Sequence, residues 1–144
     1  MDEKDAFQLQ GFLPYLLNQA AEAASLSFQK IYKGRYGMLR TEWRVLFHLG
    51  LYGRLTATEI GARSGLHKTK ISRAVAALEE KRFIVRERDE ADRRVEYLTL
   101  TASGHAAYKD LRAIAQSHEE RLLKAFTPEE AALIKRGLKR LAGA

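Results

Sequence analysis

The stretch that most limits what this chain can fold into is residues 55–82, where two short helical patterns are separated by one glycine turn. Thr56, followed three positions later by Glu59, is a capping box, which predicts the start of a helix of only about two turns. Gly65 marks a tight turn out of that helix, because glycine adopts left-handed backbone conformations without a steric penalty. A further helix is predicted from about Lys68 to Lys81, and the pair therefore has the form of a helix-turn-helix.

A charged hairpin is predicted directly after this helix pair. Two short β-favouring runs, "FIVRER" (83–88) and "VEYLTLT" (95–101), flank the acidic segment "DEAD" (89–92). A hairpin in that place is the wing of a winged helix-turn-helix. Most of the remaining sequence is rich in Ala, Leu, Glu, Lys and Arg, which favour helix. The predicted fold class is therefore mainly α with a small β-wing (α+β).

Helices are also predicted before the helix-turn-helix. An apolar stripe at helical spacing runs from about Ala6 to Tyr32, and Pro14 near its beginning is expected to kink or delay the helix. The segment "KGRYGMLR" (33–40) interrupts this pattern with two glycines. Thr41 is then expected to cap a short helix that ends at "GLYG" (50–53).

Two more helices are predicted after the wing, and with the first helix they carry more apolar surface than a small core needs. Thr101 is expected to cap a long helix that reaches about Phe126, and "TPEE" (127–130) to open a last one. Their apolar stripes consist of Tyr108, Leu111, Ile114, Ala115, His118, Leu122 and Phe126, and of Leu133, Ile134, Leu138 and Leu141. The surplus indicates a surface for a partner.

The outward face of the second helix of the pair is predicted to be basic, slim and rich in hydrogen-bonding groups. On a helical wheel, Ile71, Val75 and Leu78 share one face, and Thr69, Lys70, Arg73 and Ala77 lie on the opposite one. Small side chains such as Ala74 and Ala77 are expected to permit close approach to a major groove about 12 Å wide. The candidate DNA contacts on this helix are His67, Lys68, Thr69, Lys70, Ser72 and Arg73. The alternative is an ordinary amphipathic helix with a solvated charged face.

The charge balance favours an anionic partner. The formal net charge is +7 and the sequence pI is about 9.8, and basic side chains gain free energy when they displace counterions condensed on nucleic acid. Between Arg54 and Arg94 the chain has eleven Lys and Arg against seven Asp and Glu. Double-stranded DNA is the expected partner. The alternative is a winged-helix protein-interaction module without DNA binding, which a steep salt dependence of binding to duplex DNA would exclude.

Other functional classes lack their sequence signals. The chain has no cysteine, which excludes disulfides, thiol redox sensing and cysteine zinc sites. Its four histidines are not paired at metal-ligand spacing, so neither a metal nor another cofactor is expected. No nucleophile, dinucleotide, P-loop or zinc-protease motif is present, so an enzyme is not expected. The acidic start "MDEKDAF" lacks signal-peptide character and no apolar run could span a bilayer, so no membrane association and a cytoplasmic location are expected.

Residues 55–104, "LTATEIGARSGLHKTKISRAVAALEEKRFIVRERDEADRRVEYLTLTASG", resemble the winged helix-turn-helix core of the MarR family of bacterial transcription regulators. The flanking helices also fit, so the resemblance covers nearly the whole chain. The residues of the family's wing motif are here Asp92, Arg94, Leu100, Thr101 and Gly104. The resemblance implies that Arg94 enters the minor groove with Asp92 orienting it, and that residues 67–73 open the recognition helix. Arg93 fills the motif's variable position and either adds a basic contact or faces water.

One position departs from the family's pattern. Family members commonly have glycine after the recognition helix, where this chain has Arg82. A non-glycine residue there either adopts a left-handed conformation at some cost or ends the helix differently. The departure leaves the orientation of the wing open, but not the fold.

The resemblance also implies an assembly and a function. Residues 1–144 are expected to form a single domain, with a DNA-binding lobe at 39–101 and a helical dimerisation region at 1–38 and 102–144. A two-fold homodimer of this kind binds a pseudo-palindromic operator. The implied function is sequence-specific regulation of transcription by a ligand-responsive repressor.

A small aromatic or phenolic effector is a further implication of the resemblance. Many family members release DNA when such a molecule binds between the dimerisation helices and the DNA-binding lobe. The residues expected to line the pocket here are Tyr15, Phe28, Tyr32, Trp43 and Phe47, with Arg40 or Arg44 meeting a carboxylate. The alternative is that these aromatic side chains are simply core, because aromatic residues at helical spacing usually pack.

Overall fold

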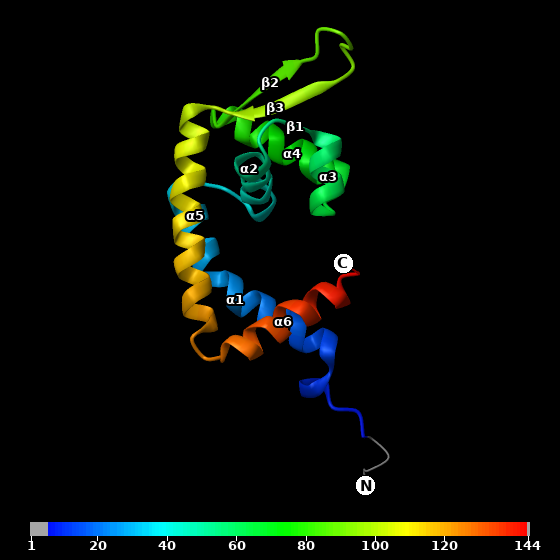
Figure 1. Ribbon diagram of the computed structural model, residues 1–144, viewed down its shortest axis with the longest axis vertical. Coiled ribbons are helices and arrows are strands. Elements are labelled where there is room, and N and C mark those ends of the chain that lie inside the picture. The colour runs from blue at the N-terminus through cyan, green and yellow to red at the C-terminus, as the bar shows by residue number, and fades with distance from the viewer. Residues whose placement is uncertain (1–5, 144) are drawn as a thin grey trace.

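The structure is a computed structural model that describes residues 6–143, so the acidic start (1–5) and residue 144 lie outside the described residues. In chain order the elements are a 3-10 turn η1 (Leu9–Gly11), α1 (Leu13–Tyr36), α2 (Arg40–Tyr52), β1 (Leu55–Thr56), α3 (Ala57–Ser64), α4 (Lys68–Glu80), β2 (Ile84–Arg88), β3 (Glu96–Leu100), α5 (Ala102–Leu123) and α6 (Pro128–Leu141). Figure 1 shows α2, α3, α4 and the sheet as a lobe at one end of α5, with the start of α1 and α6 near the other end. The mainly α fold with a β-wing is confirmed.

The lobe combines three helices with a three-stranded antiparallel sheet in the order β1-β3-β2. Ile84 pairs with Leu100 and Leu55 pairs with Leu98, so the short strand β1, which the sequence did not predict, completes the sheet. The core side chains with at most 2% of their surface exposed include Leu46, Leu49, Ile60, Ile71, Leu78 and Leu98. Burial of each such side chain stabilises the fold by about 1.5–3 kcal/mol. This packing fixes the orientation of α4 within the lobe.

The local signals that begin α3, α5 and α6 and that end α3 are confirmed. Thr56 Oγ1 accepts the Glu59 N–H at 3.1 Å, and Glu59 Oε1 accepts the Thr56 N–H at 2.8 Å. Gly65 ends α3 in the left-handed conformation, with φ of 73°. Thr101 Oγ1 accepts the Gly104 N–H at 3.0 Å at the start of α5, and a second capping box opens α6.

The first two helices differ from the prediction at their ends. Pro14 lies in the first turn of α1, where its missing N–H is not needed, so the expected delay of the helix, and not a kink, is confirmed. Gly34 does not interrupt α1, which ends only at the left-handed Gly37, with φ of 64°. The prediction that Thr41 caps α2 is wrong. Leu39, in extended backbone conformation, holds the cap position and makes no side-chain cap.

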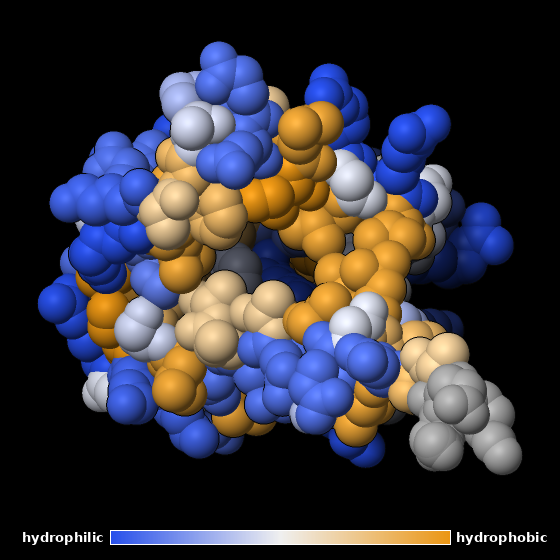
Figure 2. All heavy atoms as spheres, turned by 90° about the horizontal axis from the view of Figure 1, so that it is seen from below, coloured by the Kyte–Doolittle hydropathy of each residue, from blue (hydrophilic) through white to orange (hydrophobic). Residues whose placement is uncertain are grey.

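One end of the molecule leaves its apolar side chains uncovered. Large apolar residues with between 38% and 58% of their surface exposed occur there on α1, α5 and α6: Leu13, Leu16, Leu122, Leu133, Ile134, Leu138 and Leu141. Figure 2, which views this end, shows apolar side chains around a central hollow. No helix among residues 6–143 has the length and apolarity needed to cross a membrane. The uncovered apolar surface is the surplus that the sequence predicted.

Candidate nucleic-acid interface

Helix α4 turns one face to the core and the other to solvent. Ile71, Val75 and Leu78 are buried, as predicted. Ala74 is also buried, with 1% of its surface exposed, so the prediction that it permits close approach to DNA is wrong. It lies three residues after Ile71 and four before Leu78, and residues at these spacings share one face of a helix.

The predicted DNA contacts of α4 all lie on its exposed face or at its N-cap. His67 is the N-cap residue, and its Nδ1 accepts the Thr69 N–H at 3.2 Å. Lys68, Lys70 and Arg73 form no ion pair with any residue between 6 and 143. The complete exposed set is His67, Lys68, Thr69, Lys70, Ser72 and Arg73. The positive charges of Lys68, Lys70 and Arg73 are therefore available to an anionic partner.

The loop of the wing holds Arg94 through Asp92, as the resemblance implied. Arg94 Nε donates to Asp92 Oδ1 at 3.1 Å and Nη2 donates to Oδ2 at 3.3 Å, while the Arg94 backbone N–H also donates to Oδ1 at 3.1 Å. The side-chain bond from Arg94, followed by the backbone bond, lowers the pKa of Asp92. The Arg94 side chain nevertheless remains 91% exposed. Asp92 thus orients a guanidinium that is open to a partner.

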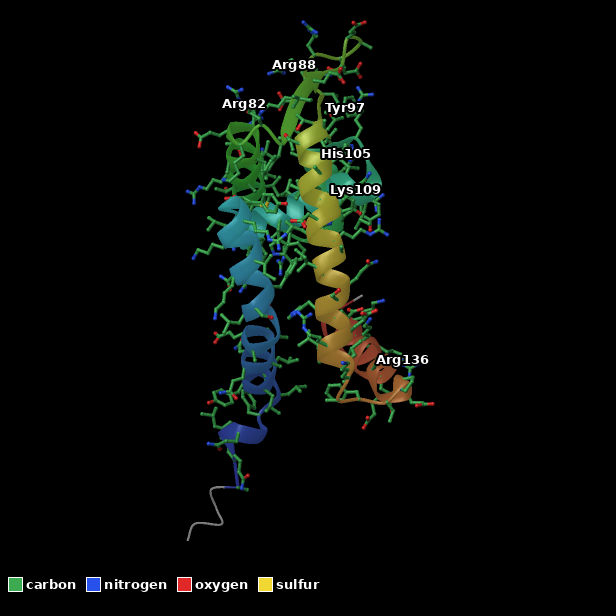
Figure 3. All side chains as sticks on the ribbon, turned by 90° about the vertical axis from the view of Figure 1, so that its left-hand side faces the viewer. Arg82, Arg88, Tyr97, His105, Lys109 and Arg136 are labelled. Carbon is green, nitrogen blue, oxygen red and sulfur yellow. The ribbon has the colours of Figure 1, made fainter. Side chains whose placement is uncertain are left out.

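The neighbouring Arg93 has a different environment. Arg88, labelled in Figure 3 on the wing, donates from Nη1 to the Arg93 carbonyl at 2.8 Å. The Asp89 N–H donates to the Val95 carbonyl at 2.9 Å and closes the loop. The Arg93 side chain itself is exposed and makes no hydrogen bond or ion pair with the described residues. Two adjacent arginines therefore carry the same charge, but only Arg94 is held by a carboxylate.

Sequence reasoning missed the role of Arg86. Arg86 Nε donates to Glu79 Oε1 at 2.9 Å, and Nη1 donates to Glu96 Oε1 at 3.0 Å. The bond to Glu79 is the largest cause of the raised pKa of Arg86. The guanidinium thereby joins both long strands of the wing to the end of α4. No local pattern pointed to this contact, because the two glutamates lie seven and ten residues from Arg86.

An open groove of about 410 Å³ lies between the start of α3, α4 and the wing. Lys68 lines it from α4, and Arg86 and Arg94 line it from the wing. Thr58 and Ser72 add hydroxyl groups. Cationic and hydroxyl side chains are the usual contacts to phosphate oxygens, so the groove has the chemistry of a site for a nucleic-acid backbone.

The connection from α4 to the wing shows how the helix ends at Arg82, where family members commonly have glycine. Arg82 is left-handed, with φ of 63°. The N–H groups of Arg82 and Phe83 donate to the carbonyls of Glu79 and Leu78, both at 2.9 Å, which is the bond pattern of a Schellman motif. The helix therefore ends as it would with glycine, and an arginine occupies the strained position.

The start of α5 holds this connection in place. The Arg82 carbonyl accepts hydrogen bonds from Thr101 Oγ1 at 2.7 Å and from Ser103 Oγ at 3.1 Å. The Thr101 N–H donates to the Phe83 carbonyl at 2.9 Å. Gly104 lies against the same backbone, since a Cβ added there would be 2.0 Å from the Phe83 oxygen.

A second hollow, of about 360 Å³, lies between α1, α2 and α5. Five of the seven residues predicted for an effector pocket line it: Phe28, Tyr32, Arg40, Trp43 and Arg44. The Phe28 ring lies 5.4 Å from that of Trp43 and stacks at 6.0 Å on His118 of α5, centroid to centroid. Phe28 and Tyr32 are also buried core residues, whereas both arginines are exposed at the rim. Sequence reasoning missed the α5 side of the hollow, formed by Ala115, His118, Glu119 and Leu122.

Two of the predicted pocket residues lie elsewhere. Tyr15 lies near the start of α1, about 20 Å along the helix from Phe28, and its hydroxyl accepts a hydrogen bond from Gln19. Phe47 packs between Trp43 and Tyr108, with ring centroids 5.1 and 5.3 Å away, and so faces α5 beside the hollow. These two side chains therefore do not line the hollow between α1, α2 and α5.

Comparison with known proteins places this geometry in a family. The family model described as MarR family matches residues 36–95. The MarR family transcriptional regulator SPO1453 from Silicibacter pomeroyi DSS-3 is 31% identical, with 95% of this chain and 97% of that chain covered and a TM-score of 0.79. The chain belongs to the MarR family of transcription regulators. A MarR/EmrR family regulator from Acinetobacter sp. ADP1 is 27% identical, with 95% of this chain and 96% of that chain covered and a TM-score of 0.83. The HTH-type transcriptional regulator YwaE of Bacillus subtilis is 25% identical over 88% of this chain and 74% of its own length.

Membership of the MarR family confirms the resemblance seen in the sequence, and the family consists of transcription regulators, which are not enzymes. The structure also gives four of the five residues of the wing motif a physical setting. Asp92 holds Arg94, Thr101 caps α5 and binds the Arg82 carbonyl, and Gly104 makes room for the Phe83 backbone.

Arg82→Gly is expected to raise the free energy of unfolding by about 0.5–1 kcal/mol. A left-handed L-residue costs about 1–2 kcal/mol, and the greater freedom of glycine in the unfolded chain offsets part of the gain. Glu80→Gly, at an exposed right-handed position two residues earlier, is the control and should destabilise by up to about 1 kcal/mol. Denaturant titration at one fixed protein concentration measures both changes. A less stable Arg82→Gly variant would contradict the assignment of strain to this residue.

Proposed function

We propose that this MarR-family regulator binds double-stranded DNA sequence-specifically as a homodimer and represses transcription at pseudo-palindromic operators. The observation that carries the proposal is that Lys68 of α4 and the carboxylate-held Arg94 line one open groove, while Lys70 and Arg73 are exposed on the same helix. Residues 67–77 would then lie in the major groove, with Arg94 in the minor groove. Within a single domain, residues 39–101 form the DNA-binding lobe, and residues 1–38 and 102–144 form the dimerisation region.

The fold of a DNA complex supports DNA over a protein as the partner of α4. MepR of S. aureus, solved as a complex with DNA, is 21% identical and has a TM-score of 0.81, with 92% of this chain and 97% of that chain covered. This likeness concerns the fold alone. The argument for DNA as the partner comes from the positive charges of this chain. A protein-interaction module has no need for lysines and arginines concentrated on the helix and hairpin that would meet phosphates.

The uncovered apolar end of the molecule supports the homodimer. Ile134, Leu138 and Leu141 form a stripe along α6, and no α6 residue described by the structure is buried within its own chain. Apolar surface of this extent is normally covered by a partner. A second copy supplies the same helices and a two-fold axis, and such a dimer places half-sites about one helical turn apart.

Arg94→Ala is expected to weaken DNA binding about tenfold, because it removes a charged contact that Asp92 has already oriented. The matched control is Arg93→Ala, which removes the same charge from the adjacent exposed position and should weaken binding less than about threefold. Electrophoretic mobility shift with a selected operator measures both affinities. Equal affinities of wild type and Arg94→Ala would exclude the proposed role of the wing.

We further propose that a small aromatic or phenolic effector binds the hollow between α1, α2 and α5. The floor offers Phe28, Tyr32 and Trp43, and the exposed Arg40 and Arg44 can meet a carboxylate at the rim. Bordetella bronchiseptica BpsR, whose DNA binding is regulated by 6-hydroxynicotinic acid, has the same fold, with 19% identity and a TM-score of 0.86. A ligand between the dimerisation helices and the lobe would change the angle between them and release DNA.

Trp43 is the only tryptophan of the chain, so its fluorescence reports on this hollow directly. Salicylate and 6-hydroxynicotinate are expected to change the fluorescence and to weaken operator binding at the same concentrations. Arg44→Ala should raise the concentration of either acid that is needed for these two effects by about tenfold, because it removes a charge-assisted contact with the carboxylate. Benzyl alcohol, which has no carboxylate, is the control ligand. Aromatic acids that neither change the fluorescence nor weaken DNA binding would contradict the proposal.

A further inference from the structure

A polar cluster joins α1 to α5 at the base of the wing. Tyr36 Oη donates to Asp110 Oδ2 at 2.6 Å, and Arg35 Nη1 donates to the two oxygens of the same carboxylate at 3.0 and 2.9 Å. The Tyr36 ring packs edge-on against Phe83, with centroids 5.8 Å apart. These four residues, Arg35, Tyr36, Phe83 and Asp110, are here called the Asp110 cluster. None of them lines the DNA-facing groove or the effector hollow.

The Asp110 cluster and the start of α5 hold the same short segment. Phe83 contacts Tyr36 through its ring, and its carbonyl accepts the Thr101 N–H. The preceding carbonyl, that of Arg82, accepts the hydroxyls of Thr101 and Ser103. Figure 3 shows Arg82 where α4 gives way to the wing, with α1 and α5 side by side below it. The end of the recognition helix is therefore fixed to both long helices.

Small changes in the tilt of α5 correspond to large displacements of the lobe in a dimer. Helix α5 has 22 residues and is therefore about 33 Å long, and the apolar end proposed to contact the second copy lies at its far end. A tilt of α5 by roughly 5° about that far end moves the lobe by about 3 Å, which is close to the 3.4 Å rise of one base pair. The Asp110 cluster holds α5 against α1 and so restrains this tilt.

We propose that Asp110 sets the separation of the two recognition helices, and with it the half-site spacing that the regulator accepts. The proposal rests on the proposed function as a dimeric DNA-binding regulator. Asp110 is a positioning residue, because it acts through Tyr36 and the base of the wing and does not touch DNA.

The protonation states of the cluster suit a permanent contact. Burial, followed by the hydrogen bond to Asp110, raises the pKa of Tyr36 to about 12. The bond from Tyr36, and to a lesser extent that from Arg35, lowers the pKa of Asp110. Tyr36 is therefore a neutral donor and Asp110 an ionised acceptor at neutral pH, and a charge-assisted bond of this kind is stronger than a neutral one. Asparagine at position 110 would keep the size of the side chain and remove its charge.

The test compares the operator spacings that wild type and Asp110→Asn select from a random duplex library. Wild type is expected to select one dominant spacing. Asp110→Asn is expected to select a broader or shifted distribution of spacings. It should bind the wild-type operator about five- to tenfold more weakly than wild type does. On operators with one base pair added or removed, its loss of affinity should be smaller. Tyr36→Phe should shift the distribution in the same direction. The matched control is Glu120→Gln, which removes a carboxylate from the exposed face of the same helix and should behave as wild type.

Comparing a variant's affinities for operators of different spacing distinguishes a positioning role of Asp110 from an effect on stability. A variant that merely folds less well loses active protein and weakens binding to all spacings by the same factor. A uniform loss, or an Asp110→Asn distribution that matches wild type with affinities within twofold, would overturn the proposal. If wild type selects no DNA sequence, the proposed function fails first, and this inference fails with it.

Discussion

Replacing Leu138 and Leu141 of α6 with aspartate is expected to abolish dimerisation and to weaken operator binding at least about 100-fold. The two leucines are 46% and 57% exposed in a single protomer, so the substitutions remove little packing there. In the proposed dimer each would bury an apolar side chain worth about 1.5–3 kcal/mol. Four such side chains per dimer amount to at least about 6 kcal/mol, before the cost of burying charge is counted.

The loss of DNA binding follows from the loss of the link between two half-sites. A dimer that has bound one half-site presents its second lobe at a high effective concentration, and a monomer does not. Sedimentation velocity gives the oligomeric state, and mobility shift with the full operator gives the affinity. Arg136→Asp is the control, because Arg136 belongs to the polar residues of the same exposed helix (Figure 3). A folded monomer that binds the full operator as tightly as wild type would contradict the proposed coupling of dimerisation to DNA binding.

The features predicted correctly from the sequence are those whose partners lie within a few residues. Thr56 and Glu59 are three positions apart, and Asp92 and Arg94 are two apart, so the hydrogen bonds follow once the local backbone is given. The left-handed Gly65 is a property of one residue. Local chemistry was therefore enough to predict the helix-turn-helix, while the expectation that Asp92 orients Arg94 came from the resemblance to the MarR family.

The features that the sequence did not predict depend on contacts between elements. Arg86 could be placed on a strand, but only the packing of that strand beside α4 brings it to Glu79. Likewise, aromatic chemistry did not reveal that Phe47 turns toward Tyr108 while Trp43 faces the hollow. The hollow itself exists because α5 lies beside α1, a pairing that helical periodicity cannot supply.

Ala74 illustrates a different kind of error, since the sequence did contain the signal. Its spacing from Ile71 and Leu78 places it on the buried face, and its small size led to the opposite interpretation. The helical spacing of apolar residues decides burial, and side-chain size decides only how closely a face can approach a partner. The correction does not affect the predicted DNA-contacting residues of α4, because each of them is exposed.

Gly104→Ala is expected to lower the free energy of unfolding by about 3 kcal/mol or more and to weaken operator binding with it. A Cβ at this position would lie 2.0 Å from the Phe83 oxygen and 2.9 Å from the Phe83 carbonyl carbon. The obstacle is backbone rather than the end of a flexible side chain, so no change of rotamer relieves it. The start of α5 must move away from the wing, and this lengthens the 2.9 Å bond from the Thr101 N–H to the Phe83 carbonyl and the hydroxyl bonds to Arg82. Overpacking against a backbone is among the most destabilising mechanisms of single substitutions, and the loss of these hydrogen bonds adds to it.

Gly34→Ala provides the matched control for this substitution. Gly34 lies within α1, and a Cβ there meets no atom within 4 Å, so alanine should stabilise the helix by up to about 1 kcal/mol. Denaturant titration of both variants at one protein concentration gives two changes of opposite sign for the same chemical replacement. A Gly104→Ala variant as stable as wild type would show that α5 and the wing can separate freely. The junction could then fix neither the wing nor the spacing of the recognition helices.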